Sequence, residues 1–497
     1  MNQDAVIVGS GLGGLCAGAK LAKSGKKVLV LEQFRIPGGY ATCYNRKNIT
    51  FEVGLQELDG FDEYDVKKTI FTELDIFSRV DFIRLPGVKR YVLDNKNIKL
   101  HCRRETSEKE LCELYPEDTR GILKFYKVIT AMRDELCRLP MKRARILALL
   151  PLFPILYPTV TRYLFTRLGP FVEKHITNSQ LKQILLANLF YFHNKINDLS
   201  LLYFSAGQGG YCRDSHYIKK GSRELSNALC SVIQEHGGQV ICRAEVSNII
   251  VDAGKVRGVE YQQNGETKTV YSSLVISNIS RQNTMKLLPS SRNSLKQQKK
   301  AEKKSLSMSF TQINIAFTVN LKDHGVDTYQ TFFTEHSIQN LQDYQDQIDG
   351  DYDIRPFVFT DYGQIESGLT EKGISYAVVL IPDEMKNWRQ LEGQKYKDRK
   401  EDVSRMIFKR LEKVYPGITS HIDFFEVATP KTMMRYTKNP EGVVYGLAQK
   451  PLQSGIFRPG IKSSLKNLFY ASAWTYPGGG FTGSLWSGWS CAHEILK

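Results

Sequence analysis

The sequence lacks the features that define several protein classes. Its 497 residues include only nine cysteines, an odd number, and no two of them form a CxxC pair. A disulfide framework and a cysteine-based zinc site are therefore not expected, and reduced thiols in the cytoplasm fit this usage best. The chain does not open with a charged segment and an apolar core, so no cleavable signal is predicted. It also has no repeat of solenoid length and no arrangement typical of a metal site or a Ser-His-Asp hydrolase.

An excess of basic charge is the clearest compositional bias. The formal net charge is +16, which suits a nucleic acid, an anionic membrane surface or an acidic substrate. Lysine and arginine are spread along the whole chain among acids, so most of them are expected on a solvated surface. No zinc knuckle, RNA-recognition signature or helix-turn-helix accompanies the charge, and nucleic acid is therefore not a predicted partner.

The first forty residues have the pattern of a dinucleotide-binding βαβ unit. Residues 4–8 predict a buried strand, residues 12–24 a helix and residues 27–31 a second buried strand, which ends at Glu32. Between the first strand and the helix lies a glycine-rich turn made of Gly9, Ser10, Gly11, Leu12, Gly13 and Gly14. The strands, the helix and the acid make this turn far more specific than an isolated GxGxxG.

Each part of this unit has a physical task. Gly9 permits the sharp turn from strand to helix, and Gly11 lets the backbone approach a pyrophosphate on the helix N-terminus. Gly14 allows close packing of the helix on the strand. Glu32 can accept hydrogen bonds from ribose hydroxyls. Only one complete unit of this kind is present, so a tightly bound second nucleotide such as NAD(P) is not expected.

Further pieces of the same domain are predicted later in the chain. Residues 221–235 form a helix, and residues 239–242, 244–251, 256–261 and 273–277 form strands, with a hairpin turn at Gly254. Near the end, residues 467–472 read as a strand, 473–483 as a glycine-rich loop and 485–496 as a helix. Strand, glycine loop and helix together again predict a cradle for an anion or a flavin.

One apolar segment has two open interpretations. Residues 146–165 contain fourteen apolar residues, but three prolines interrupt them, so a spanning helix is not expected. The segment suits either a membrane interface or a buried core. Basic residues flank or interrupt it and would meet anionic head groups, namely Lys142, Arg143, Arg145, Arg162 and Arg167.

These motifs resemble the bacterial phytoene desaturase family and its carotenoid isomerase and retinol saturase relatives. The resemblance is carried by Glu32 and the following Gly38-Gly39 pair, by Thr429-Pro430, and by the C-terminal glycine loop. It implies an FAD cofactor, with Gly38 and Gly39 near the ribityl and pyrophosphate region. It also implies that Val246 contacts adenine through its backbone, and that Gly480, Phe481 and Thr482 lie near the flavin ring.

One position departs from the family pattern. Ala473 stands where the family usually has an aspartate that binds the ribityl-phosphate region. Alanine cannot supply the carboxylate, which predicts a weaker hold on FAD or one that uses the backbone alone. Glu32 and the phosphate loop are unaffected, so FAD is still expected.

The predicted fold is α/β, with a discontinuous Rossmann-like FAD domain and an inserted α+β substrate domain. Residues 1–60, 217–285 and 425–497 are assigned to the FAD domain, and residues 61–216 and 286–424 to the substrate domain. A helical, membrane-facing subdomain is expected near residues 142–167. The predicted localisation is cytoplasmic and peripheral to the membrane.

The resemblance implies an oxidoreductase that desaturates, saturates or isomerises a long apolar polyene or isoprenoid. The sequence identifies no catalytic residue. Arg435 and Tyr445 are candidates to face flavin or substrate, with core packing or a surface ion pair as the alternatives. A flavin amine oxidase and a non-enzymatic binder of prenyl lipids share the expected fold and remain as alternative functions.

Overall fold

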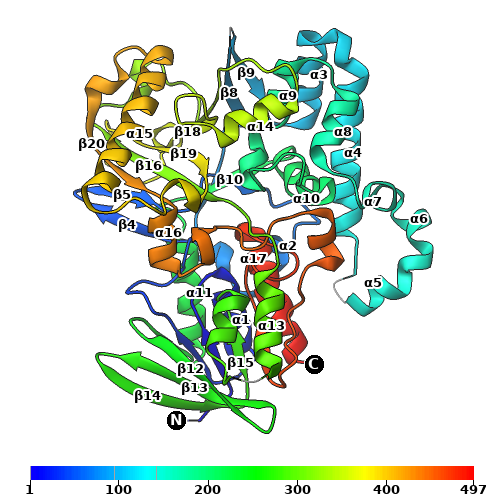
Figure 1. The fold of residues 1–497 in the computed structure, drawn as a ribbon, viewed down its shortest axis with the longest axis vertical. Helices are drawn as coiled ribbons and strands as arrows, with labels where there is room; N and C mark the ends of the chain where they lie inside the picture. The colour runs from blue at the N-terminus through cyan, green and yellow to red at the C-terminus, as the bar shows by residue number, and fades with distance from the viewer. Residues whose placement is uncertain (1, 95, 141–142, 291) are drawn as a thin grey trace.

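The computed structural model describes residues 2–94, 96–140, 143–290 and 292–497. Figure 1 shows two bodies, each built around a sheet, with both termini in the lower one. The lower body contains a five-stranded sheet and the upper body a seven-stranded sheet. Because the chain passes between the bodies several times, the lower sheet combines segments that lie far apart in the sequence.

The lower sheet is wholly parallel. Its three central strands are buried along their whole length, which is why they read as continuous apolar runs and not as alternating ones. The predicted α/β class with a parallel Rossmann-like sheet is therefore confirmed. In spatial order the strands are β11 (Gln239–Ile241), β3 (Val28–Leu31), β2 (Ala5–Val8), β15 (Val275–Ser277) and β21 (Leu468–Tyr470).

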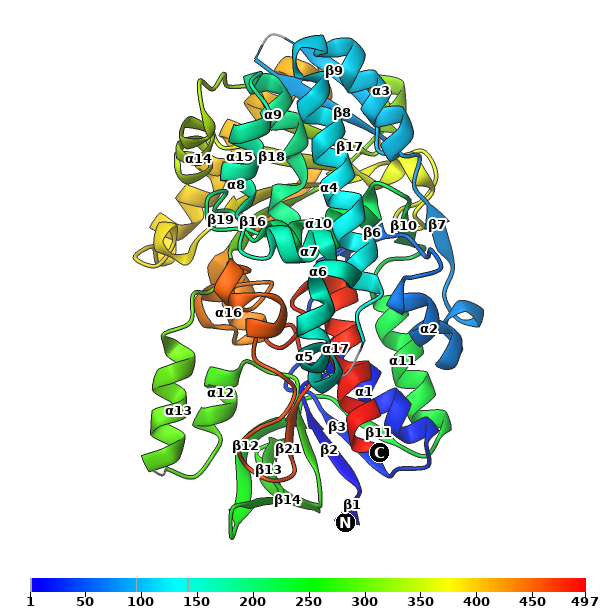
Figure 2. The ribbon, with the colours of Figure 1, turned by 90° about the vertical axis from the view of Figure 1, so that its right-hand side faces the viewer.

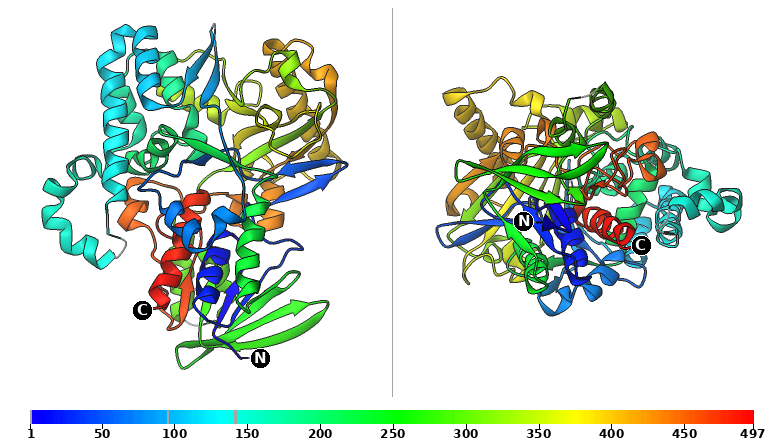
Figure 3. Two further views of the ribbon diagram at one scale, coloured as in Figure 1. Left: turned by 180° about the vertical axis from the view of Figure 1, so that it is seen from behind. Right: turned by 90° about the horizontal axis from the view of Figure 1, so that it is seen from below.

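Two helices from opposite ends of the chain pack closely beside this sheet. They are α1 (Leu12–Lys23) and α17 (Gly480–Ile495), which lie side by side in Figures 2 and 3. A Cβ atom at Gly488 would lie 2.1 Å from the carbonyl oxygen of Gly13, so glycine is required at this crossing. On its other side α1 packs against α11 (Arg223–Glu235), where Gly18 leaves room for Ile233.

The C-terminal helix begins earlier than predicted. It starts at Gly480 and not at Leu485, because the second half of the glycine loop is itself helical. Gly483 lies in the first turn, where a Cβ atom would be 2.6 Å from the carbonyl oxygen of Gly478. The glycines therefore serve close packing within the helix as well as the turn before it.

A smaller sheet covers one end of the lower body. Gly254, with φ of +74°, forms the predicted hairpin turn between its two longest strands. In order the strands are β1 (Asn2–Gln3), β14 (Glu266–Ser272), β13 (Lys255–Gln263) and β12 (Glu245–Asp252).

The upper sheet is mixed, with one parallel pair. It is formed by β20 (Ile422–Ala428), β16 (Ser309–Phe317), β19 (Tyr376–Asp383), β18 (Phe357–Asp361), β17 (Gln330–Thr334), β8 (Val88–Leu93) and β9 (Asn97–His101). Strands β17 and β8 are parallel, and the other neighbours are antiparallel. Strand β20 contains the predicted domain limit at residue 425 and belongs to this sheet along its whole length.

The two faces of the upper sheet have different partners. Along β16, Ile313 and Ile315 pack toward α15 (Gly393–Val414). Gln312 and Asn314, which alternate with them, line a cavity on the opposite face. Helices on that face form a separate core, and they are α4 (Thr119–Cys137), α8 (Leu168–His175) and α10 (Leu201–Tyr211).

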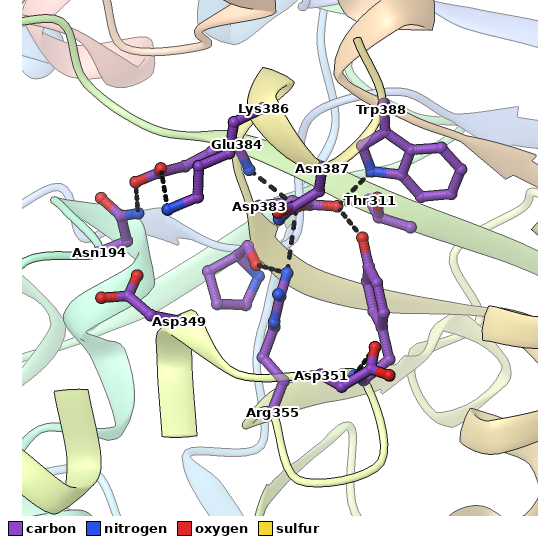
Figure 4. A network of polar contacts seen from close by, with 12 residues as sticks. Asn194, Thr311, Asp349, Asp351, Arg355, Asp383, Glu384, Lys386, Asn387 and Trp388 are labelled. Carbon is purple, nitrogen blue, oxygen red and sulfur yellow. Dashed lines mark hydrogen bonds and ion pairs between the residues drawn. The ribbon is translucent and has the colours of Figure 1, made fainter. Parts of the chain in front are cut away.

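A saturated polar cluster fixes the end of β19. Figure 4 shows the Asp383 carboxylate surrounded by donors from several segments. Oδ1 accepts from Arg355, Asn387 and the Glu384 amide, at 3.1, 2.7 and 2.8 Å. Oδ2 accepts from Thr311, Tyr352 and Trp388. The carboxylate is fully buried, so these bonds replace its hydration.

The proline-rich segment forms a chain of short helices that stands out from the body in Figures 1 and 3. They are α5 (Arg143–Leu149), α6 (Phe153–Leu156) and α7 (Pro158–Tyr163), separated at the prolines as expected. Lys142 and the side chain of Arg143 lie outside the described residues. Within the described part of the chain, no helix has both the length and the apolar character required to cross a bilayer.

Candidate functional site

A cavity of about 1650 Å³ lies between the two bodies. One part is lined by the glycine-rich turn after β2 and by the glycine loop before α17. Another part is apolar and is lined by α4, α5–α7, α10 and the inner face of the upper sheet. Among the residues the structure describes, no group of three or more His, Cys, Asp or Glu side chains could hold a metal ion.

The predicted site residues converge on this cavity, with one exception. Gly14 does not line it, and a Cβ atom there would instead lie 2.5 Å from the carbonyl oxygen of Gly9, which makes its role one of packing. The predicted residues that do line it are Gly9, Ser10, Gly11, Leu12, Gly13, Glu32, Gly38, Gly39, Val246, Ala473, Gly480, Phe481, Thr482, Arg435 and Tyr445.

The N-terminus of α1 lines the cavity and has no capping side chain. Gly11 is the N-cap, and it has no side chain that could accept from the first amides of the helix. The Gly11 amide itself donates to Asn278 Oδ1 at 2.8 Å, which fixes the turn. Free amides and the helix dipole favour an anion at this point.

Glu32 is held in place by the turn that it faces. Its Oε2 accepts from the Ser10 amide at 2.9 Å and from Ser10 Oγ at 2.6 Å, while Oε1 accepts from the Phe34 amide at 2.8 Å. A carboxylate offers about four acceptor positions, so capacity for a ligand hydroxyl remains.

The two glycines after Glu32 bring the chain back to the phosphate turn. Gly38 has φ of +115° and donates its amide to the Ser10 carbonyl oxygen at 3.0 Å. Gly39 has φ of +61°, and a Cβ atom there would lie 3.5 Å from the Cα of Gly11. The backbone conformation at Gly38 is one that favours glycine, so the return of the chain depends on this residue type.

The glycine loop before α17 gives the cavity a second uncapped helix N-terminus. Gly479 is the N-cap, without a side-chain hydrogen bond, and Gly480, Phe481 and Thr482 follow it on the cavity wall. Because the N-termini of α1 and α17 both line this cavity, two positive helix ends would act on an anion bound there.

A buried arginine that the sequence did not reveal supports this loop. Arg458 is 1% exposed and donates to the carbonyl oxygens of Ala473, Leu447 and Thr475 at 2.7, 3.1 and 3.0 Å. Burial lowers the pKa of its guanidinium to about 10. The arginine thus fixes Ala473, the position that lacks the expected carboxylate.

Two aspartates and a lysine meet the start of α17. Lys67 is fully buried, and its Nζ lies 3.0 Å from Asp59 and 2.7 Å from Asp65. Thr482 Oγ1 accepts from Lys67 at 3.0 Å and donates to Asp59 at 2.8 Å. Burial raises the pKa of the Asp65 carboxyl to about 6, and the charge of Lys67 opposes that rise.

The sequence reasoning missed this acidic pair. Asp59 ends β6 (Leu58–Asp59) and Asp65 is the N-cap of α2 (Val66–Glu73), so each has an ordinary local explanation. Both residues line the cavity, and Asp59 accepts from Thr482. Their closeness to the C-terminal loop depends on contacts across more than 400 residues of sequence.

Tyr445 and Arg435, the two candidates to face flavin or substrate, occupy different positions. Tyr445 lines the apolar part of the cavity, with its ring 6.2 Å from that of Phe310 in an edge-on contact. Arg435 is exposed at the rim, on the last turn of α16 (Pro430–Thr437). His193, by contrast, is buried away from the cavity, and burial lowers the pKa of its imidazole to about 4.

Known proteins resemble this chain both in its dinucleotide-binding segment and over nearly its whole length. Residues 7–74 match the model of an NAD(P)-binding Rossmann-like domain. The prolycopene isomerase of Arabidopsis thaliana is 27% identical over 99% of this chain and 82% of that protein. The human all-trans-retinol 13,14-reductase is 25% identical over 99% of this chain and 85% of that protein. Over its full length, the chain is homologous to prolycopene isomerases and all-trans-retinol 13,14-reductases.

Solved structures show how widely the fold is used. An oxidoreductase from Methanosarcina mazei superposes with a TM-score of 0.65 at 15% identity, and both chains are covered completely. A putrescine oxidase gives 0.65 at 14% identity, over 100% of this chain and 99% of the other. A Rab GDI from Plasmodium falciparum gives 0.55 at 12% identity, over 99% and 98%. The fold alone therefore does not decide the function.

Proposed function

We propose that this protein is an FAD-dependent oxidoreductase acting on carbon–carbon bonds of a long apolar polyene or isoprenoid. The observation that carries the proposal is the cavity, in which a dinucleotide-type slot and an apolar wall belong to one space. Its full-length relatives are named for reactions on prolycopene and all-trans-retinol. The reaction class covers desaturation, saturation and flavin-assisted isomerisation.

The residues present fit FAD. The amides at the start of α1 would receive the pyrophosphate, Glu32 the adenosine ribose, and the backbone near Val246 the adenine. Residues 480–482 would lie along the flavin ring, and the carbonyl groups fixed by Arg458 would shape the loop at Ala473. When bound, the flavin supplies exchange of hydride with the substrate.

The Asp59–Lys67–Asp65 cluster is the best candidate for handling a proton. It borders the cavity at the N-terminus of α17, where Thr482 links Lys67 to Asp59. A carboxyl with a pKa of about 6 can hold a proton and release it near neutral pH. We assign Asp65 to this task, with Lys67 stabilising its charged form.

The apolar part of the cavity would accept the hydrocarbon chain. Residues of the segment 146–165 close one side of it, and they include Ile146, Leu150, Phe153, Val160 and Leu164. Together with the opposite wall, formed by residues such as Phe192, Phe310 and Leu380, they exclude water from a ligand of low polarity.

We also propose that the protein attaches peripherally to membranes through α5–α7. Four side chains of this segment join the core, and they are Ile146, Phe153, Tyr157 and Val160. Six large apolar side chains of residues 146–165 are exposed, and they are Leu147, Leu150, Leu152, Ile155, Leu156 and Phe165. Since the same segment lines the cavity, a bilayer bound there would deliver an apolar substrate directly.

Vesicle sedimentation tests the attachment. Wild type should pellet with vesicles of phosphatidylcholine and phosphatidylserine, and Leu152→Asp with Ile155→Asp should stay in the supernatant. Leu295→Asp, at an equally exposed leucine in α13 (Arg292–Glu302), is the matched control and should pellet like wild type. Equal sedimentation of all three proteins would remove the membrane proposal. Phe153 is a poor choice for this test, because it is buried.

Turnover tests the function itself. Purified protein should show flavin absorbance and should change the double-bond number or geometry of an added polyene such as prolycopene or all-trans-retinol. Product analysis by chromatography and mass spectrometry distinguishes the three reactions. Flavin-containing protein that leaves every polyene unchanged but oxidises amines would contradict the proposal.

A further inference from the structure

Three basic side chains line one end of the cavity without acidic partners. They are Lys400 in α15 and Lys431 and Arg435 in α16, and together they form the cationic rim. Within the part of the chain that the structure describes, none of the three forms an ion pair. Lys431 and Arg435 are four residues apart on one helix, where like charges repel each other. A bound anion would remove this repulsion.

Tyr396 of α15 brings the cations of the two helices together. Its hydroxyl forms a hydrogen bond with Thr429 Oγ1 at 2.7 Å, at the N-cap of α16. The centroid of its ring lies 4.7 Å from Lys400 Nζ and 5.6 Å from Lys431 Nζ, so both ammonium groups approach the same ring. Arg435 follows Lys431 by one helical turn and lies on the same side of α16.

The side chains of the cationic rim keep most of their hydrogen-bond donors. Lys431 donates to the carbonyl oxygen of Leu391 at 2.7 Å, and its ammonium has further N–H groups to offer. Among the described residues, no atom accepts from the Lys400 ammonium or the Arg435 guanidinium. Arg435 is exposed, and Lys400 and Lys431 are half-buried. The rim is therefore accessible from solvent and has donors for a ligand.

The acidic residues on either side of α16 are already paired. Glu426 in β20 lines the cavity and accepts from Arg46 at 2.6 Å and from Tyr44 at 3.0 Å. Glu245, which also lines the cavity, forms an ion pair with Lys438. Neither carboxylate is left to balance the cationic rim. The rim thus keeps a local positive charge that favours a multivalent anion.

The cationic rim and the apolar segment lie on different sides of the molecule. In Figure 1, α16 lies on the left and α5–α7 on the right. Both nevertheless contribute residues to the one cavity, which has an apolar end and a cationic end. A ligand from solvent would therefore meet the rim without passing the face that we propose for membrane attachment.

We propose that Lys400, Lys431 and Arg435 bind the diphosphate group of a ligand that enters the cavity at this rim. A diphosphate offers several charged oxygens to cations on two helices, whereas one carboxylate has only two. Arginine suits two-pronged contact with a phosphate, and lysine acts as a point charge. The group can belong to a nucleotide or to a prenyl diphosphate. The site goes beyond the proposed function and does not depend on polyene turnover.

Titration calorimetry with inorganic pyrophosphate tests the site. The protein is used as purified, in low salt and without divalent metal ions. Wild type should bind pyrophosphate about tenfold or more tightly than acetate, since acetate cannot meet all three cations. Lys400→Met and Arg435→Met should each weaken pyrophosphate binding by about tenfold. Lys395→Met is the matched control, because Lys395 is an exposed lysine of α15 that does not line the cavity. It should bind like wild type.

Two further probes identify the molecule that carries the diphosphate. ADP that binds more tightly than pyrophosphate would indicate a nucleotide. Geranylgeranyl diphosphate that binds more tightly would indicate a prenyl ligand whose chain enters the apolar part of the cavity. Either ligand should lose about tenfold in affinity in Arg435→Met. Equal binding of all three probes would support the diphosphate group alone as the recognised feature.

Three results would overturn the site. Wild type that binds pyrophosphate no better than acetate would show that the rim does not select a diphosphate. Equal losses in Lys395→Met and Lys400→Met would indicate a general effect of surface charge. Unchanged affinity in both Lys400→Met and Arg435→Met would place the anion elsewhere, for example at the N-terminus of α1. None of these results bears on the proposed function, which flavin content and polyene turnover test separately.

Discussion

Asp383 and Glu57 are both carboxylates without solvent exposure, yet their surroundings differ. Asp383 accepts hydrogen bonds from six donors, with three on each oxygen. Glu57 accepts one bond on Oε2, and no atom of the described residues donates to its other oxygen. The two carboxylates are thus equally buried but accept very different numbers of hydrogen bonds. A carboxylate with all its acceptor positions filled stabilises the fold, whereas one with an unpaired buried oxygen contributes less to stability.

The largest expected effect comes from breaking the saturated cluster. Asp383→Ala leaves the buried Arg355 guanidinium without its carboxylate and removes the acceptor of Trp388 and Tyr352. The free energy of unfolding should fall by about 3–5 kcal/mol in urea titrations. Asp423→Ala removes an exposed partner of Lys47 and should cost less than about 1 kcal/mol. Similar losses in both variants would show that saturation does not distinguish the two carboxylates.

The buried Asp65 carboxyl should make the stability of the protein depend on pH. Its pKa is raised from 3.8 to about 6 in the folded protein, so the folded state binds more protons than the unfolded state between these values. Its contribution is therefore greatest below pH 4 and is lost as the pH rises through 6. Between these two pKa values, the free energy of unfolding of wild type should fall by up to about 3 kcal/mol relative to that of Asp65→Asn. Parallel stability curves for the two proteins would refute the raised pKa.

Replacing each carboxylate together with its basic partner should show a further difference between Glu57 and Asp383. Glu57→Gln keeps an oxygen acceptor for Lys89 but removes the negative charge that balances its buried ammonium. The free energy of unfolding should therefore fall by about 1.5–3 kcal/mol. Adding Lys89→Met removes the unpaired charge and should restore most of this loss. Adding Arg355→Met to Asp383→Ala should not restore stability, because Tyr352 and Trp388 still lack an acceptor. Rescue at both positions, or at neither, would contradict the comparison.

The smallest expected effect is the loss of an unpaired donor. Gln56→Leu removes Nε2, which bonds to no described atom, and one long hydrogen bond from Tyr191. The free energy of unfolding should change by less than about 1 kcal/mol. A loss of several kcal/mol in urea unfolding would assign Gln56 to the fold.

Local patterns predicted the dinucleotide half of the molecule well. The parallel strands and the helix after Gly11 follow from apolar runs and glycine spacing, which act over a few residues. The start of α17 was placed too late because glycines in a first helical turn read as loop until their packing against Gly478 is seen.

The polar clusters could not be predicted in this way. Glu57, Lys89 and Tyr191 come from a loop, a strand and a short helix that meet only through tertiary packing. The same holds for Arg458, whose partners are carbonyl groups and so leave no signature in the sequence. For Asp59 and Asp65, the spacing to Lys67 was visible, but their closeness to Thr482 depends on contacts across most of the chain.

Flavin content tests the central claim most directly. Wild-type protein purified without added cofactor and then denatured should release close to one FAD per chain, as measured by absorbance and chromatography. Glu32→Ala removes the carboxylate that Ser10 and Phe34 hold toward the cavity, and it should lower FAD occupancy while the circular dichroism spectrum stays unchanged. A Glu32→Ala protein with full FAD content would refute Glu32 as the ribose anchor, and wild type that takes up no FAD would contradict the assignment of this cavity to a flavin dinucleotide.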